Sequence, residues 1–167
     1  MRLLTSLCII ACISVAAQEA ASPNQLFREG VQAFYDAKPK ESVAAFDKLI
    51  ALTPESKPQL WQRGLSLYYV GDYKAGREQF ETHQTVNTAD VENAAWHFIC
   101  VARAESVEAA RKALIPIEGD TRVPMKQVHE LFAGKGSVED VLKAAASGEG
   151  RQNFHTPDSR GKAGAQC

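Results

Sequence analysis

The stretch Lys57–Thr88, KPQLWQRGLSLYYVGDYKAGREQFETHQTVNT, decides the fold of this chain. One helical face is indicated by apolar and small residues that recur every three or four positions, namely Leu60, Gly64, Leu67 and Tyr68. Gly71–Asp72 breaks this run, and a second face follows with Tyr73, Gly76, Phe80 and His83. Each predicted helix has about a dozen residues, which is too few for stability in isolation. The pair is therefore expected to be one unit of a stacked array.

The pattern recurs 34 residues away on both sides of this stretch. Gly30, Phe46 and Pro54 correspond to Gly64, Phe80 and Thr88, and Ala110 and Leu114 correspond to Gly76 and Phe80. The third copy is degenerate, because it has Phe98 where a small residue is expected. A 34-residue period of helix-turn-helix units is the signature of tetratricopeptide repeats. We expect an all-α, right-handed helical-repeat solenoid of about three such units and a short terminal helix pair.

The central copy resembles the tetratricopeptide-repeat family in Leu60–Trp61, Gly64, Tyr68, Gly71–Asp72–Tyr73, Gly76 and Phe80. Residues 42–146 are also similar to a group of exported bacterial tetratricopeptide proteins loosely related to the NlpI lipoprotein. This second resemblance implies an adaptor that recruits other proteins of the cell envelope. In those relatives another repeat follows, whereas here the similarity ends near Ala146.

Outside the central stretch, further helices are expected over residues 24–37, 41–52, 91–103, 107–114 and 123–132. Ser22–Pro23–Asn24 is typical of a helix cap, and Thr53–Pro54 is expected to end the second helix. A capping box at Ser137–Asp140 predicts a last short helix through Ala146.

The two ends of the chain differ from its middle. Residues 1–17 read as a signal peptide, with a positive Arg2, a short apolar run and a small-residue cleavage site before Gln18. The alternative is a lipobox ending at Cys12, which would anchor the protein to the envelope through lipid. We therefore expect a periplasmic or secreted repeat domain over 18–146. Residues 147–167 lack apolar periodicity and are expected to be a disordered or aberrant tail.

Composition excludes several classes of function. The net charge of −1 disfavours nucleic-acid binding, which needs a basic face. Only Cys100 and Cys167 follow the leader, too few for a disulfide framework. Glycine-rich phosphate loops and the common hydrolase or metalloprotease motifs are absent from the sequence. We therefore expect neither catalysis nor a cofactor.

A binding face is suggested by the first helix of each unit, which lines the concave side in the family that the chain resembles. The residues expected there are Phe34, Tyr35, Trp61, Leu65, Tyr68, Tyr69, Glu92 and Arg103. Such an aromatic column could hold a segment of a partner protein. The same aromatic residues could instead pack the repeats against one another.

His83 stands where the family has a small residue. His97 and Cys100 fall on the facing helix, so the three could in principle bind zinc or form a Cys–His pair. A buried, hydrogen-bonded histidine beside a buried cysteine is the interpretation we favour, since metal-ligand spacing is lacking.

The polar segment from Glu118 to Arg122 is interpreted as a solvated connector. Three hypotheses follow from the sequence. The first is an adaptor that binds a protein or peptide, and the second is a metal-dependent or Cys–His enzyme. The third is a truncated fragment, which predicts an exposed apolar surface on Val138, Val141 and Leu142.

Overall fold

The computed structural model describes residues 21–147, and these residues form helices without any strand. The helices are α1 (Pro23–Tyr35), α2 (Pro39–Leu52), α3 (Trp61–Val70), α4 (Tyr73–Gln84), α5 (Val91–Ala104), α6 (Val107–Lys112), α7 (Met125–Phe132) and α8 (Val138–Ala146), with a 3-10 helix η1 (Pro54–Gln59) between α2 and α3. The all-α prediction is thus confirmed for this range. The expected leader and all but the first residue of the expected tail lie outside it.

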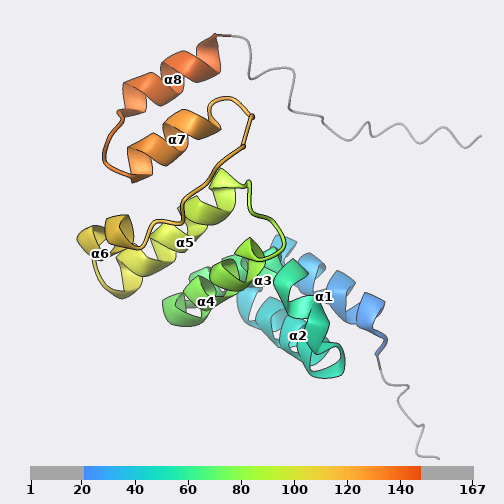
Figure 1. Cartoon of the computed structure of the whole chain (residues 1–167). Helices are drawn as coiled ribbons and strands as arrows, with labels where there is room; N and C mark the ends of the chain where they lie inside the picture. The colour runs from blue at the N-terminus through green and yellow to red at the C-terminus, as the bar shows by residue number, and fades with distance from the viewer. Residues whose placement is uncertain (1–20, 148–167) are drawn as a thin grey trace, which may run out of the picture.

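Except for α6 and α7, consecutive helices pack against one another along the chain, and α1 and α8 lie at opposite ends of the array (Figure 1). Helix α3 also contacts α1 and α5, while α7 packs on α5 rather than on α6. None of the described helices has the length and apolarity that crossing a membrane requires.

Most helix boundaries follow the predicted local signals. The Ser22 hydroxyl accepts a hydrogen bond from the backbone N–H of Gln25, and Ser137 and Asp140 form the expected capping box of α8. Helix α6 ends earlier than expected, so Leu114 lies beyond it. The 3-10 helix η1 was not predicted, because Thr53–Pro54 was expected only to end the second helix.

A close glycine–phenylalanine contact recurs between the two helices of the first and second units. A Cβ at Gly30 would lie 2.8 Å from the ring of Phe46, and a Cβ at Gly64 would lie 2.6 Å from the ring of Phe80. Both partners are shifted by 34 residues from one unit to the next. Each ring therefore occupies the space that any larger residue at the glycine would need.

Two further contacts recur between neighbouring units with the same shift. The first joins Asp47 of α2 to Arg63 of α3, and its counterpart joins Glu81 of α4 to His97 of α5. The second joins Ser42 to Ser66, whose hydroxyls are 2.8 Å apart. At the corresponding place, the Sγ of Cys100 would lie 3.0 Å from a Cβ at Gly76. The two junctions are thus built from matching positions.

The third unit departs from this scheme. Phe98 occupies the place of Gly64, and its ring packs on Phe132 of α7, with the ring centroids 4.9 Å apart. Leu114 and Ala110 belong to the same apolar cluster. In the third unit the phenylalanine is therefore on α5, the first helix of the unit, where it packs against α7.

Candidate binding surface

Six aromatic side chains from α1, α3, α4 and α5 form a continuous row, which we call the aromatic ladder. In order, its members are Tyr35, Phe34, Tyr69, Tyr68, Trp96 and Phe80, and successive ring centroids are 6.0, 6.0, 5.5, 5.5 and 6.5 Å apart. These separations are typical of favourable aromatic pairs. The ladder therefore links the first unit to the third across the second.

The ladder has an exposed end and a buried end. Tyr35 and Tyr69 are 77% and 60% exposed, whereas Phe80 is buried. Leu65, predicted to belong to the binding face, is only 8% exposed and packs beneath the ladder in a cluster with Phe80 and Cys100. Four of the eight predicted residues thus belong to the ladder itself, while Leu65 supports it.

Arg103 reaches the ladder through Tyr73. Its Nη2 donates a hydrogen bond of 2.7 Å to the Tyr73 hydroxyl, and its guanidinium carbon lies 4.9 Å from the centre of that ring. The ring of Tyr73 in turn contacts that of Tyr68, with the centroids 5.5 Å apart. The predicted charged end of the face is therefore connected to the aromatic row.

A pocket of about 600 Å³ opens beside the buried end of the ladder, and we call it the Trp pocket. It lies among η1, the first turn of α3, the end of α4 and the start of α5. Its lining residues are Gln59, Trp61, Phe80, His83, Val86, Asn87, Asp90, Glu92, Asn93 and Trp96. The predicted residues Trp61 and Glu92 meet here, and Phe80 and Trp96 belong both to the pocket and to the ladder.

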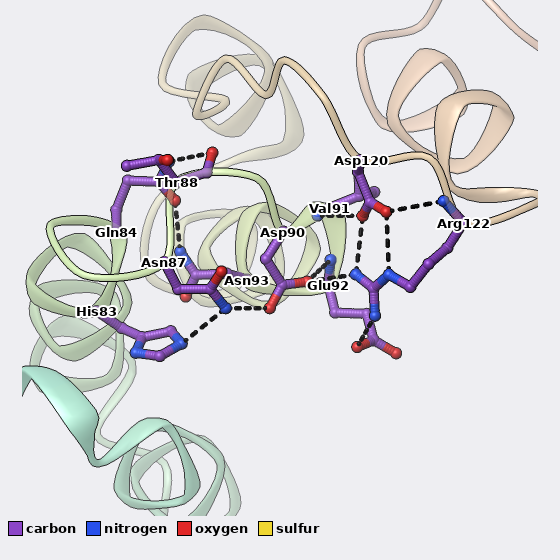
Figure 2. A network of polar contacts seen from close by, with 10 residues as sticks. All are labelled: His83, Gln84, Asn87, Thr88, Asp90, Val91, Glu92, Asn93, Asp120 and Arg122. Atoms are coloured by element: carbon purple, nitrogen blue, oxygen red, sulfur yellow. Dashed lines mark hydrogen bonds and ion pairs between the residues drawn. The ribbon is translucent and has the colours of Figure 1, made fainter. Parts of the chain in front are cut away.

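A polar network frames one side of the Trp pocket (Figure 2). It begins at His83, whose Nε2 accepts a hydrogen bond from Asn87, and Asn87 donates to Asp90 at 2.9 Å. Asp90 caps α5 by accepting from the N–H of Glu92, and it also accepts from Arg122 at 2.8 Å. The loop before α7 is thereby tied to the start of α5.

Arg122 is shared by three carboxylates, those of Asp90, Glu92 and Asp120. The Asp120 side chain is only 3% exposed and also accepts the backbone N–H of Val91. The hydrogen bond from Arg122 lowers the pKa of Asp120, and the hydrogen bond to Asp120 raises the pKa of Arg122. The interpretation of residues 118–122 as a solvated connector is therefore wrong for Asp120 and Arg122, which anchor the loop.

His83, His97 and Cys100 make separate contacts. His83 donates through Nδ1 to the carbonyl of Pro58 at 2.7 Å, which confirms that this buried histidine has hydrogen-bond partners. The Nε2 of His97 is 3.1 Å from Glu81 Oε1, and hydrogen bonds from Cys100 to either histidine are absent from the described residues.

Chemistry at these three residues has little geometric support. Burial raises the pKa of the Cys100 thiol to about 12, so the thiol is protonated near neutrality. Among residues 21–147, no group of three or more His, Cys, Asp and Glu side chains is arranged to hold a metal ion. The structure therefore gives the Cys–His hypothesis no paired nucleophile and base.

Sequence phasing named four of the six ladder residues and two of the ten lining residues of the Trp pocket, and it missed Trp96. The residue 34 positions after Trp61 is Ala95, so the expected aromatic position carries a small side chain and its neighbour carries the indole. The available signal in the sequence was this aromatic residue one position after the expected one. Asn93 and Asp90 were missed as pocket residues because their contacts come from the loop geometry between α4 and α5.

Comparison with known proteins returned no relative. No family model matches the chain, and no curated protein or solved structure matches it either.

Proposed function

We propose that the protein is a non-catalytic binding scaffold that holds a segment of a partner protein along the aromatic ladder and in the Trp pocket. One observation carries the proposal: exposed aromatic side chains of α1 and α3 form a continuous row with the aromatic wall of a pocket. Large aromatic residues dominate the binding energy of many protein interfaces. They offer much apolar contact area and lose little side-chain entropy on binding.

The scaffold is proposed to be a tetratricopeptide array. Its support is the recurrence of the Gly30–Phe46 contact at Gly64–Phe80 and of the Asp47–Arg63 pair at Glu81–His97. Contacts that repeat at a fixed spacing both within and between units are expected of a solenoid, in which each unit contacts only its neighbours. The concave side of such an array is a binding surface of ready-made shape.

The proposal includes a location in the bacterial envelope, periplasmic or secreted, or lipid-anchored through Cys12. Support for it comes only from the sequence of residues 1–17 and from the resemblance of residues 42–146 to exported proteins. A protein or peptide is the proposed partner, and neither a nucleic acid nor a cofactor is part of the proposal.

Site-specific photo-crosslinking tests the scaffold function. A photoreactive amino acid is placed at Tyr69, on the ladder, or at Leu52, which is equally exposed on α2 but is not a ladder residue. We expect a discrete crosslinked partner in cells from position 69 and none from position 52. The purified partner should then bind the full-length protein, and Tyr35→Ala/Tyr69→Ala should weaken that binding at least about tenfold. Equal crosslinking from both positions, or unchanged affinity of the double variant, would contradict the proposal.

A further inference from the structure

The walls of the Trp pocket are aromatic on more than one side. Trp61 enters it from the start of α3 and is 43% exposed. Trp96 enters from α5 and stacks on Phe80, with an angle of 18° between the rings. The faces of such rings carry partial negative charge, so they attract a cation placed against them.

The charged groups of the pocket are acidic. Asp90 and Glu92 line it, and neither lysine nor arginine is among its described lining residues. Arg122, which pairs with both carboxylates, also pairs with Asp120. Three carboxylates thus share one guanidinium, so the network has a net negative charge (Figure 2).

Several hydrogen-bond donors of the pocket are occupied, and one buried acceptor beside it is unpaired within residues 21–147. The side-chain N–H groups of His83 and Asn87 are used by Pro58 and Asp90. Asn93 is 4% exposed and donates to Phe80 and Gln84, but its Oδ1 has no hydrogen-bond partner among the described residues. An unpaired buried acceptor is costly, and a ligand that donates hydrogen bonds can relieve that cost.

We propose that the Trp pocket binds a lysine or arginine side chain of the partner segment. This inference rests on the scaffold function and adds the chemistry of its partner. The alkyl stem packs on the indoles, and the cationic end faces Glu92 and Asp90. An acidic segment would add to the excess negative charge of Asp90 and Glu92, and a purely apolar one would bury these carboxylates without a further cation.

The two tryptophans of the chain, Trp61 and Trp96, both line the pocket, so intrinsic fluorescence reports binding there directly. The probes are blocked tetrapeptides without tryptophan or tyrosine that differ at one position: lysine, arginine, norleucine or glutamate in a leucine background. Each is titrated into the full-length protein at low and high salt. We expect a saturable change with the lysine and arginine peptides, and binding of the norleucine peptide weaker by about threefold to tenfold. High salt should reduce the difference in affinity between the cationic peptides and the norleucine peptide, because it screens charges.

Matched variants locate the effect. Glu92→Gln removes one carboxylate of the pocket at an exposed position, and Glu105→Gln removes an equally exposed carboxylate elsewhere, paired with Arg77. We expect Glu92→Gln to weaken the lysine peptide about threefold to tenfold and to leave the norleucine peptide unchanged, while Glu105→Gln changes neither. Trp61→Leu, which keeps an apolar wall, should also reduce the preference for lysine.

The outcomes separate the inference from the scaffold function. Equal binding of the lysine and norleucine peptides, no effect of Glu92→Gln, or no saturable change with any peptide would overturn the cation pocket. The scaffold function would stand in each case if Tyr69 still crosslinks a partner, and it would fall on its own if Tyr69 does not.

Discussion

The Nε2 of His97 lies 3.1 Å from the carboxylate of Glu81, in the same place where the preceding junction pairs Arg63 with Asp47. An arginine is charged at every accessible pH, whereas a histidine is not. The two junctions of the array therefore share a geometry but differ in their response to acid.

Stability should fall on acidification through His97. Burial lowers the pKa of His97 below its ordinary value of 6.5, although the hydrogen bond to Glu81 opposes this. The folded protein then binds the proton less readily than the unfolded chain does. The stabilisation that neutral His97 contributes is complete above about pH 6.5. As the pH falls toward the pKa of His97 in the folded protein, the free energy of unfolding decreases by at most about 1.4 kcal/mol per pH unit.

Urea unfolding between pH 7.5 and 5.5 measures this slope. His97→Gln, which keeps a donor for Glu81 but does not titrate, should flatten it. An unchanged slope in His97→Gln would show that another group controls the acid response.

Gly64→Ala should destabilise the second unit. The added Cβ would lie 2.6 Å from the ring of Phe80, which is buried and cannot move aside freely. We expect a loss of about 1–3 kcal/mol in the free energy of unfolding. The double variant Gly64→Ala/Phe80→Leu should recover part of that loss relative to the sum of the single effects. Strict additivity of the two substitutions in thermal or urea unfolding would contradict the contact.

Asp120 should matter more than Glu92 for attaching the loop before α7. Both pair with Arg122, but the Asp120 side chain is buried and also accepts the N–H of Val91. Asp120→Ala should cost about 2–3 kcal/mol, and Glu92→Ala less than about 1 kcal/mol. Amide exchange at Val91 should accelerate only in Asp120→Ala. Similar costs for the two variants would argue against the buried anchor.

Cys100 should resist thiol reagents in the folded protein. Its pKa is raised to about 12 by burial, and its Sγ packs against Gly76. In a chain whose other cysteines, Cys8, Cys12 and Cys167, are replaced by serine, labelling at pH 8 should be at least about a hundredfold slower than in urea. Rapid labelling without denaturant would show that the core between α4 and α5 opens readily.

The helices could be predicted from the sequence, and so could the four residues of the expected binding face that lie in the aromatic ladder. Both depend on local periodicity. Gly30 and Gly64 face Phe46 and Phe80 because two helices in a repeating unit must approach at a fixed point. Phe34, Tyr35, Tyr68 and Tyr69 share a face because they fall at equivalent positions of consecutive units. The truncated-fragment hypothesis expected Val138, Val141 and Leu142 to be exposed on α8; Val138 and Leu142 are exposed, whereas Val141 is partly buried.

The rest of the surface depends on contacts that no local pattern records. Arg122 reaches Asp90 across 32 positions in the chain, and loop geometry rather than periodicity sets that distance. Trp96 keeps the 34-residue phase but corresponds to Gln62, which is not aromatic, so the preceding unit gives no signal for its place in the ladder. The burial of Leu65 follows from the aromatic side chains of neighbouring helices that pack over it.

The junctions between α2 and α3 and between α4 and α5 use matching positions, so one unit can be followed by another copy of the second unit. A second copy of residues 57–90 inserted after residue 90 would place Gly76 against a duplicated Ser66 and Glu81 against a duplicated Arg63. Each encounter is a new pair made from one member of each existing one, because Gly76 now meets Cys100 and Glu81 now meets His97, while Ser66 meets Ser42 and Arg63 meets Asp47. The chain thus carries a template for its own extension, with an added set of Trp61, Tyr68 and Tyr69 side chains that would lengthen the row of aromatic positions by one module.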